Sequence, residues 1–349
     1  MKKLRLAVIG LHFGKTHAVN LREGNARGGE LAALVDLNES HAGMAASWGV
    51  PFFTDYREML SKIKPEGVII ATPPRTHLSI AVDCMEAGAH IYLEKPVAVS
   101  SEEADELIAA EKRLNKKIHV GFHNRFDPTV IMAREKIASG DLGRLIGFQI
   151  FGALPKPEGY FAPEYRRQRK AGGGVVSING THDLDKIRFL CGEVDTVFAL
   201  KASVIRGFDE IEDTAAVSIR CKNGALGTLY VSDCSHPASE FTDTYFLEKG
   251  TIRLKCSSFF RQAGFHVYEE SSFGEAGLDP TVPERIKNIK TVNIPYQNPH
   301  ARAVEFFCSM VLDNLEPRTT TADGKKSMEL MNAVIESMDT GKIVYLYTP

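Results

Sequence analysis

Short apolar segments alternate with amphipathic segments over the first 122 residues of the chain. The apolar segments are rich in Val, Ile and Ala and are apolar on both faces, which is typical of parallel strands covered by helices. These predicted strands are residues 4–10, 31–36, 67–72, 90–94 and 117–122. Between them, residues 76–87 and 102–114 carry apolar side chains at spacings of three and four, the period of a helix. This alternation predicts right-handed crossovers and a doubly wound parallel sheet.

The pattern changes after Asn124. Residues 127–139 are predicted to form a helix, and the strands that follow it are longer and alternate apolar with polar residues, as antiparallel strands do. These strands are residues 146–151, 196–204, 214–221 and 226–232. Asn223 and Gly224 lie between the last two strands and indicate a hairpin turn. The remaining predicted elements are helices at residues 181–191, 300–314 and 325–340 and a last strand at residues 343–347.

These patterns predict an α/β protein with two domains, which its 349 residues allow at about 150 residues per domain. Residues 1–123 are expected to form a Rossmann domain with a doubly wound parallel sheet. Residues 124–349 are expected to form an α+β domain with a large, open, mostly antiparallel sheet.

The balance of charge narrows the classes of function. The chain has 42 Lys and Arg against 44 Asp and Glu, a net charge of −2, so it lacks the basic surface that nucleic-acid binding usually requires. Its 44% of hydrophobic and 25% of charged residues are ordinary for a globular protein. We therefore expect no nucleic-acid partner.

Targeting and metal-binding signals are weak in this sequence. No apolar stretch approaches the roughly 18 residues of a membrane span, and the short apolar run after Lys2 and Lys3 lacks a cleavage site for secretion. The six cysteines form no CxxC pair and are expected to be buried free thiols. The eleven histidines are scattered, so no metal site is predicted. We expect a cytoplasmic protein without a membrane partner.

A glycine-containing turn follows the first predicted strand, at Gly10 and Gly14. Glycines suit such a turn because the chain bends sharply and its backbone approaches a pyrophosphate at the helix N-terminus. His12 stands where a middle glycine is usual, and the spacing to Gly14 is one residue short of GxGxxG. An ordinary strand-to-helix turn is the alternative interpretation. If the turn binds a dinucleotide, the side chain of His12 must point away from the diphosphate.

Asp36 ends the second predicted strand, 22 residues after Gly14, where an acid can accept hydrogen bonds from the adenosine ribose hydroxyls. The alternative is a helix N-cap, but Asn38 and Ser40 are also available for that role. No Arg or Lys follows Asp36 immediately to hold a 2′-phosphate. The sequence therefore favours NAD over NADP as the cofactor.

The next two strands end in TPPRTH (residues 72–77) and LEKP (residues 93–96), which brings polar groups to the carboxyl edge of the sheet. With these segments the chain resembles the Gfo/Idh/MocA family of glucose-fructose oxidoreductases and inositol dehydrogenases. The resemblance covers nearly the whole chain. The segments that carry it are the first glycine turn, TPPRTH, AGAHIYLEKP, VGFHNRFDP, SGDLGRLIG, GGGVVSINGTHDLD, EDTAAVSIRCKNGALGT and ESMDTGK.

The resemblance implies an oxidoreductase that passes hydride between nicotinamide and a hydroxyl-bearing carbon of a sugar, polyol or related compound. It places the catalytic lysine at Lys95, where an ammonium would hold the reacting hydroxyl and stabilise alkoxide charge. It also implies that Glu94 contacts the cofactor ribose. The cofactor-binding residues expected from the motifs and the resemblance together are Gly10, His12, Phe13, Gly14, Asp36, Thr72, Pro73, His77, Glu94, Lys95, Asn124 and Arg125.

The resemblance also implies that His182 is the general base, and imidazole suits proton transfer near neutral pH. The alternative interpretation is an ordinary helix start, with Thr181 as the N-cap and Asp183 favoured by the helix dipole. Both can hold if His182 faces the substrate. Asp185 lies three residues on and is expected on the same helix face.

Residue 178 departs from the family pattern, because many relatives carry Asp or Asn four residues before this histidine and this chain has Ile178. Asn179 is polar but cannot accept a proton. An inositol-dehydrogenase type of specificity is therefore not implied, although Lys95 and His182 keep the residues for hydride chemistry.

Two further segments complete the predicted site. Asn124 and Arg125 fall where the family contacts its cofactor, with an ion pair between domains as the alternative for Arg125. Four basic residues precede a glycine triplet, and Arg166 or Arg167 among them is expected to reach the substrate. Such a run is usually a solvated surface, but it could also favour an anionic group such as a sugar acid or a phosphate.

The sequence thus predicts an NAD-dependent dehydrogenase of a small hydroxy compound, with Arg166, Arg167, Asn179, His182 and Asp185 at the substrate. Two alternatives remain open: a non-catalytic sensor that binds NAD(H), and an enzyme that cleaves glycosides with the help of NAD. We expect a homodimer or homotetramer formed through the open sheet of the second domain, because an exposed flat sheet otherwise risks uncontrolled pairing.

Overall fold

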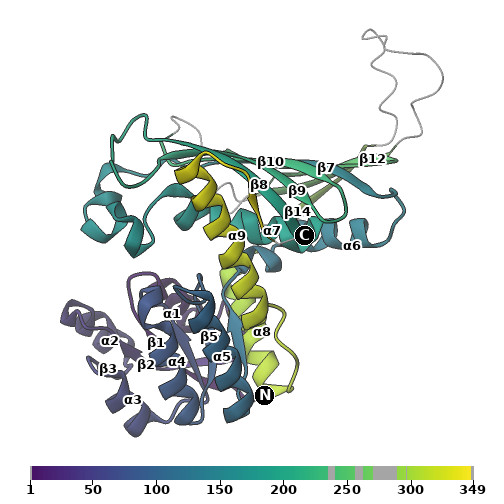
Figure 1. Ribbon diagram of the computed structural model, residues 1–349. Coiled ribbons are helices and arrows are strands. Elements are labelled where there is room, and N and C mark those ends of the chain that lie inside the picture. The colour runs from purple at the N-terminus through teal and green to yellow at the C-terminus, as the bar shows by residue number, and fades with distance from the viewer. Residues whose placement is uncertain (1, 235–239, 256–261, 270–288, 296, 347–349) are drawn as a thin grey trace, which may run out of the picture. The chain divides into compact units, whose positions relative to one another are not determined.

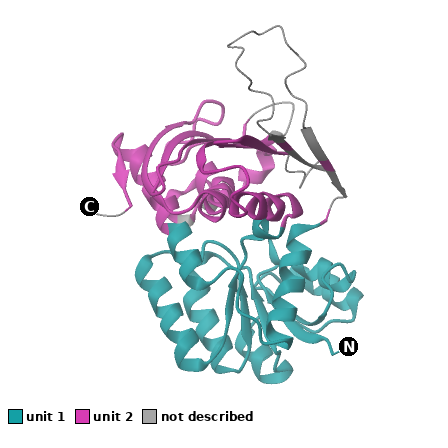
Figure 2. Ribbon diagram, turned by 90° about the vertical axis from the view of Figure 1, so that its right-hand side faces the viewer, with its two compact units in different colours: residues 1–126, 298–328 teal, residues 127–297, 329–349 magenta. Residues whose placement is uncertain are grey.

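The computed structural model describes residues 2–234, 240–255, 262–269, 289–295 and 297–346. The chain forms two compact units, shown in different colours in Figure 2. The first contains residues 1–126 and 298–328, and the second contains residues 127–297 and 329–349. This division differs from a single boundary after residue 123, because a late segment of the chain packs with the first unit.

The first unit contains a six-stranded parallel sheet with the order β3-β2-β1-β4-β5-β6. The strand order reverses between β1 and β4, the place where doubly wound sheets bind their ligands. The sheet confirms the predicted fold class, although the sequence analysis did not predict β3. The strands are β1 (Leu4–Ile9), β2 (Gly29–Val35), β3 (Phe52–Phe53), β4 (Gly67–Ile70), β5 (His90–Leu93) and β6 (Ile118–Val120).

Some helices of this unit begin or end with recognisable caps. Ser100 accepts a hydrogen bond from Glu103 N at the start of α5, and Asp55 accepts one from Arg57 N at the start of α3. Asn115 ends α5 in the left-handed conformation that Asn adopts more readily than most residues. The helices that follow the first five strands are α1 (Gly14–Arg22), α2 (Ala42–Trp48), α3 (Tyr56–Ile63), α4 (His77–Glu86) and α5 (Ser101–Leu114).

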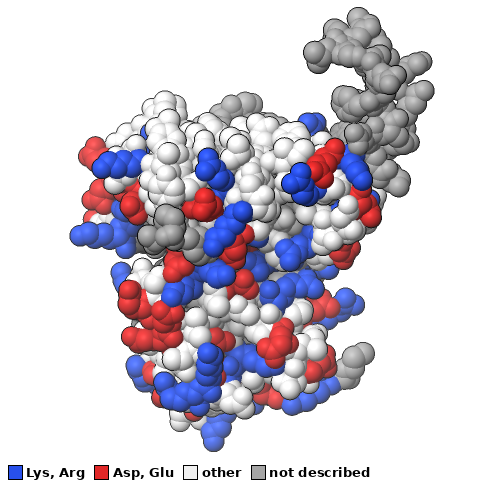
Figure 3. All heavy atoms as spheres, turned by 45° about the vertical axis from the view of Figure 1, so that its right-hand side comes forward, with Lys and Arg blue, Asp and Glu red and all other residues white. Residues whose placement is uncertain are grey.

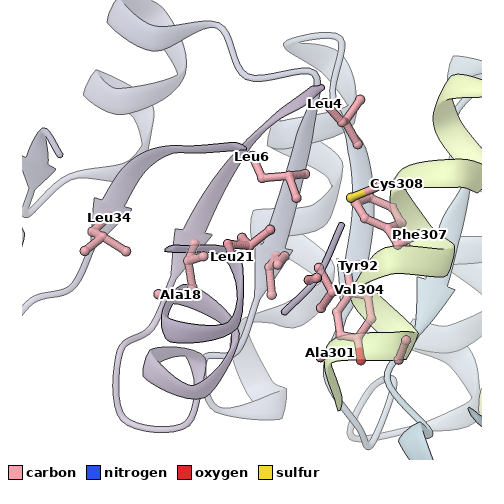
Figure 4. Close-up of a cluster of buried hydrophobic side chains, with 14 of the residues drawn as sticks. Leu4, Leu6, Ala18, Leu21, Leu34, Tyr92, Ala301, Val304, Phe307 and Cys308 are labelled. Carbon is pink, nitrogen blue, oxygen red and sulfur yellow. The ribbon is translucent and has the colours of Figure 1, made fainter. Parts of the chain in front are cut away.

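A helix from the late part of the sequence, α8 (Pro299–Leu312), also belongs to the first unit. Its Phe307 and Cys308 are fully buried in one hydrophobic cluster with Leu4 and Leu6 of β1, as Figure 4 shows. The chain then returns along β6, where Val120 N donates to the carbonyl of Thr319. The apolar face of α8 therefore completes the core of the Rossmann sheet.

The second unit contains a nine-stranded sheet with the order β14-β13-β12-β11-β7-β10-β9-β8-β15. Its strand pairs are antiparallel except β7–β10, which is parallel. The predicted strands correspond to β7 (Leu145–Ala153), β8 (Val194–Ala202), β9 (Thr214–Cys221), β10 (Leu226–Ser232) and β15 (Val344–Tyr345). The strands that the sequence analysis did not predict are β11 (Glu240–Leu247), β12 (Gly250–Lys255), β13 (Gln262–Glu269) and β14 (Ile289–Pro295).

The predicted hairpin turn is present between β9 and β10, with Gly224 at φ +88°. One face of the nine-stranded sheet is covered by α6 (Pro128–Ala138) and α7 (Thr181–Cys191), as Figure 1 shows. The last long helix, α9 (Thr321–Thr340), begins in the first unit and ends in the second. The predicted last strand is shorter than expected, and its final residue, Tyr347, lies outside the described residues.

We expect Phe307→Ala to lower the free energy of unfolding of the first unit by about 3–5 kcal/mol, because it opens a cavity in a buried aromatic site. Trp48 is the only tryptophan of the chain and packs against the same core, so its fluorescence during urea unfolding reports on this unit. Leu37→Ala is the control, since Leu37 is 89% exposed. Equal effects of the two substitutions would contradict the placement of α8 in this core.

Candidate active site

The predicted site residues fall into two groups, one in each unit, and each group has its own geometry. In the first unit, Gly10 has φ +88°, and a Cβ atom there would lie 2.7 Å from the carbonyl oxygen of Ala71. A Cβ atom on Gly14 would lie 2.9 Å from Cγ1 of Val8. Both glycines are therefore required by close packing of the turn against the ends of β1 and β4.

The N-terminus of α1 suits an anionic ligand. Its first turn contains no acidic residue, and within the described part of the chain no side chain caps it. The positive end of the helix dipole is therefore not offset locally, which fits the diphosphate of a dinucleotide. His12 and Phe13 are exposed at this end of the helix, so the side chain in the usual glycine position is not packed into the turn.

Asp36 connects the end of β2 to the glycine turn. Its Oδ2 accepts a hydrogen bond from Leu11 N at 2.5 Å, and its Oδ1 accepts one from Asn38 N at 2.8 Å. The cap of the short helical turn Glu39–His41 is Asn38, which accepts from Ser40 N. Asp36 is therefore not this cap. Each of its carboxylate oxygens retains a lone pair for a ribose hydroxyl.

His77 joins the loops that follow β4 and β5. It is fully buried, and its Nε2 lies 2.9 Å from the carbonyl oxygen of Thr72. Burial lowers the pKa of His77 more than backbone hydrogen bonds to Thr72, Val97 and Pro96 raise it, so the ring is neutral near pH 7. With no exposed surface, His77 shapes the two loops around Thr72 and Lys95 rather than contacting a ligand itself.

Glu94 and Lys95 leave the end of β5, and the Glu94 side chain is buried. Glu94 Oε1 lies 2.7 Å from Nε2 of His17 on α1, and Glu94 Oε2 accepts from Lys95 N at 3.3 Å. Burial acts to raise the pKa of Glu94, but the hydrogen bond and charge of His17, together with the charge of Lys95, lower it below the ordinary value. Glu94 is therefore an ionised carboxylate at neutral pH, and Lys95 beside it is partly exposed.

His17 was missed by the sequence analysis. The signal that could have revealed it is its spacing, since it lies three residues after Gly14 and so about one helical turn into α1. A polar residue there faces the sheet, and a buried histidine on such a face must find a partner.

Arg125 lies in the turn His123–Phe126 and is only 4% exposed. Its Nη1 is 3.6 Å from Oδ2 of Asp323 in the first turn of α9. Both residues belong to the first unit, so this ion pair holds the returning segment within the unit instead of joining two domains. Asn124 beside it is partly exposed, and Thr72 and Pro73 also retain exposed surface.

In the second unit, a π-helical turn, Val176–Gly180, runs directly into α7. Gly180 is the N-cap of α7, and Thr181 is its first helical residue, so the prediction of Thr181 as the cap is wrong. The reason is that the π turn already continues the helical backbone, with Ile178 N donating to Gly174 O. His182 and Asn179 are partly exposed, as is Ile178.

Asp185 does not share the exposure of His182, since it is fully buried. Its predicted place at the substrate is therefore not supported by the surface of this unit. The face of α7 that carries buried residues is wide, because Asp183 and Lys186 are buried as well.

A buried ion cluster fixes α7 on the sheet. Lys186 Nζ lies 2.9 Å from Oδ1 of Asp183 and 2.7 Å from Oδ2 of Asp243 on β11. Burial raises the pKa of Asp243, and the charge of Lys186 opposes that rise. The cluster sets the rotation of α7 about its axis and thereby the direction in which His182 projects.

The basic run before the glycine triplet is not uniform. The guanidinium of Arg166 lies 3.7 Å from the ring centroid of Tyr160, and Arg169 Nη1 lies 2.7 Å from Oε2 of Glu212. Glu212 is buried and also accepts from Val176 N at the start of the π turn. Arg167 is exposed, as is Lys170. The run therefore combines residues that support the turn before His182 with residues that face solvent.

Within the described ranges, no group of three or more His, Cys, Asp or Glu side chains has the arrangement of a metal site. The same part of the chain contains no helix that is both long and apolar enough to cross a membrane.

The first unit is thus a nucleotide-binding Rossmann domain, and the second carries a partly exposed histidine above an antiparallel sheet. Residues 4–122 match the oxidoreductase family with an NAD-binding Rossmann fold named GFO/IDH/MocA, and residues 130–253 match the GFO/IDH/MocA C-terminal domain. The chain belongs to this family of NAD-dependent oxidoreductases, which confirms the resemblance seen in its motifs.

Individual relatives cover most of the chain. The inositol 2-dehydrogenase of Rubrobacter xylanophilus is 27% identical over 265 residues, 72% of either chain. The 1,5-anhydro-D-fructose reductase of Ensifer adhaerens is 24% identical over 330 residues, 93% of either chain. The WlbA dehydrogenase of Bordetella pertussis, solved with NADH and UDP-GlcNAcA, superposes with a TM-score of 0.79 at 23% identity and 100% coverage of both chains. This last likeness shows a shared fold.

We expect Lys186→Met to destabilise the second unit by about 3–5 kcal/mol, because it leaves two buried carboxylates without a counter-charge. Since burial raises the pKa of Asp243, the native state binds a proton there more readily than the unfolded chain does. The loss is therefore largest at high pH and becomes smaller as the pH falls.

Thermal unfolding followed by far-ultraviolet circular dichroism at several pH values measures this effect, with Trp48 fluorescence as a reference for the first unit. Lys201→Met is the matched control, since Lys201 pairs with Asp339 at the surface of the same unit. A loss in Lys186→Met no greater than in this control, or one that does not change with pH, would contradict the role of the cluster.

Proposed function

We propose that this protein is an NAD-dependent dehydrogenase that transfers hydride between nicotinamide and a hydroxyl-bearing carbon of a sugar, polyol or sugar acid. The observation that carries the proposal is the end of β5, where the ionised Glu94 is followed at once by the partly exposed Lys95. This pair leaves the carboxyl edge of the sheet next to the switch point between β1 and β4. The named activities of the relatives, on inositol and on 1,5-anhydro-D-fructose, support the class of substrate.

The residues around the glycine turn fit the cofactor. We assign the diphosphate to the turn between Gly10 and Gly14 at the N-terminus of α1, and the adenosine ribose to Asp36. The remaining cofactor contacts belong to the exposed parts of the loops that carry Thr72 and Asn124. NAD, when bound, supplies the hydride acceptor.

The chemistry of the hydroxyl falls to two residues. The Lys95 ammonium donates a hydrogen bond to the reacting hydroxyl and stabilises the negative charge that develops on its oxygen. His182 accepts the proton of that hydroxyl as general base, since imidazole exchanges protons readily near neutral pH. The buried cluster around Lys186 keeps the helix that carries His182 in one orientation.

The substrate is recognised by residues that precede His182 in the chain. Ile178 offers an apolar contact where many relatives have an acid, and Asn179 offers an amide one residue on. We assign an anionic or strongly polar part of the substrate to Arg166 and Arg167, which precede the glycine triplet. The WlbA dehydrogenase, which has a similar fold, was solved in complex with UDP-GlcNAcA, and this ligand agrees with an acidic group on the substrate.

The proposal is tested by incubating the protein with NAD and a panel of inositols, polyols, aldoses and aldonic acids while NADH absorbance is followed. We expect Lys95→Ala and His182→Ala each to lower the rate by about 100-fold or more, and His182→Ala to leave the NADH affinity nearly unchanged. Lys62→Ala is the control, because Lys62 is exposed and pairs with Glu58 on its own helix.

Each other outcome indicates a different function. Tight NADH binding without turnover on any compound would favour a sensor, and glycoside cleavage without net NADH would favour the NAD-assisted hydrolysis route. A rate that survives both substitutions would contradict the assigned chemistry.

We also propose that the exposed face of the nine-stranded sheet binds a second copy of the chain. Its outward side chains include Leu200, Leu226, Tyr230 and Phe246, all at least 38% exposed, and Phe151 stacks on Tyr230 at 5.1 Å. Such an apolar area on a flat sheet is unusual for a monomer. The face of the molecule drawn in Figure 3 carries interspersed Lys, Arg, Asp and Glu.

We expect Leu200→Glu with Tyr230→Glu to convert a homodimer or homotetramer to monomers, because each introduced carboxylate would be buried without a partner. Light scattering after gel filtration measures the mass. Lys222→Glu is the control, since Lys222 lies in the exposed hairpin turn. A wild-type protein that runs as a monomer would contradict the proposal.

We propose a cytoplasmic location as well. The described cysteines, Cys84, Cys191, Cys221, Cys234 and Cys308, are free thiols, and most of them are buried. Free thiols are usual in a reducing compartment.

A further inference from the structure

His17 is a buried titratable residue that the proposed chemistry does not use. Its side chain has no exposed surface, although α1 carries it next to the glycine turn. Its Nε2 lies 2.7 Å from Oε1 of Glu94, while its Nδ1 has no hydrogen-bond partner among the described residues. A buried imidazole with one strong contact and one unpartnered nitrogen requires an explanation.

The surroundings of His17 fix which nitrogen carries the proton. Rings surround it, with centroids of Phe13, Tyr92 and His300 at 5.6, 5.1 and 6.0 Å. A proton on Nδ1 would have no acceptor among the described residues, whereas a proton on Nε2 is donated to the carboxylate of Glu94. We therefore place a proton on Nε2, with His17 as donor and Glu94 as acceptor.

The carboxylate of Glu94 is held from several sides. His17 donates to Oε1, and the backbone N–H of Lys95 donates to Oε2. Gly121 closes a third side, because a Cβ atom there would lie 3.0 Å from Oε1. The Glu94 side chain therefore has little freedom, and its second oxygen is tied to the backbone of the proposed catalytic lysine.

We propose that His17 is a positioning residue of the cofactor site, which holds the ionised Glu94 in place to receive a ribose hydroxyl of NAD. His17 acts through Glu94 and touches neither cofactor nor substrate. Because Glu94 also accepts from Lys95 N, the same contact steadies the backbone of Lys95. This inference rests on the function proposed above.

His17 and Lys95 are the groups that keep Glu94 ionised. The other titratable groups that interact with Glu94 come from α4, β5 and α8: His77, Tyr92 and His300. Burial lowers the pKa of His77, lowers that of His300 to about 4 and raises that of Tyr92, so these three are neutral near pH 7. Without the donor on His17, burial raises the pKa of Glu94.

Two substitutions of similar size separate the donor from the bulk of the side chain. In His17→Gln the amide nitrogen can take the position of Nε2, whereas in His17→Asn it can take only that of Nδ1. We expect His17→Gln to bind NADH within about 3-fold of the wild type. We expect His17→Asn to bind about 10- to 100-fold more weakly at pH 7, as removal of a hydrogen bond to a charged group predicts.

The measurement is a fluorescence titration with NADH between pH 5.5 and pH 8.5. The wild-type affinity should change little over this range, because the pKa of Glu94 is lowered. In His17→Asn the affinity should fall as the pH decreases, since Glu94 then takes up a proton within the range. His119→Asn is the control, because His119 is equally buried in the same unit and neither of its ring nitrogens has a partner among the described residues.

The outcomes distinguish this inference from the proposed function. If the wild type does not bind NADH, both fail. If the wild type binds and His17→Asn matches it at every pH, or if His119→Asn weakens binding as much as His17→Asn does, the positioning role of His17 is wrong. Should His17→Asn not fold, Glu94→Gln decides: it must weaken NADH binding at least 10-fold, and an unchanged affinity would overturn the inference.

Discussion

A carboxylate can be buried at the end of a strand only where donors face it, and Glu94 at the end of β5 is such a group. Its charge depends on a histidine from α1 and on the backbone of the next residue. The positions of the glycine turn, of α1 and of the loop after β5 therefore all depend on contacts with Glu94. Moving any of them would leave a buried charge or a buried imidazole without its partner, which is costly.

The second unit also holds a buried charge through partners from other parts of the chain, but there the central charge is positive. Lys186 is a buried cation between two carboxylates, and through them α7 is joined to β11. Each of the two proposed reacting groups, Lys95 and His182, therefore lies within a few residues of a buried charged group that is held by its partners. Buried pairs of this kind contribute orientation more reliably than net stability. In a dehydrogenase, catalysis depends on the orientation of each reacting group.

The sequence predicted the parallel sheet of the first unit well, because its strands are apolar on both faces and the helices between them are amphipathic. It did not predict β3, which has only two residues, or β11, where Asp243 faces inward and breaks the apolar alternation. In β12 the alternation is clean, with Ile252 and Leu254 buried, so that strand could have been found. Pattern alone also placed α8 in the wrong half, since an apolar helix face does not say which core it will join.

The candidate site was predictable as far as motifs and chain order determine it. The glycine turn and the end of β5 lie at the same sheet edge because parallel strands share that edge. The partner of Glu94 and the burial of Asp185 were not predictable, because both depend on contacts between elements far apart in the chain.

The return of α8 to the first unit has a consequence for how the protein is made. The Rossmann sheet is complete by residue 120, but the helix that fills its core ends only at residue 312. During synthesis the apolar surface around Leu6 and Gly67 therefore stays uncovered until nearly two hundred further residues, including α8, have been added. A fragment that stops after the last strand of that sheet would keep this surface open, so the first half of the chain alone does not form a self-sufficient domain.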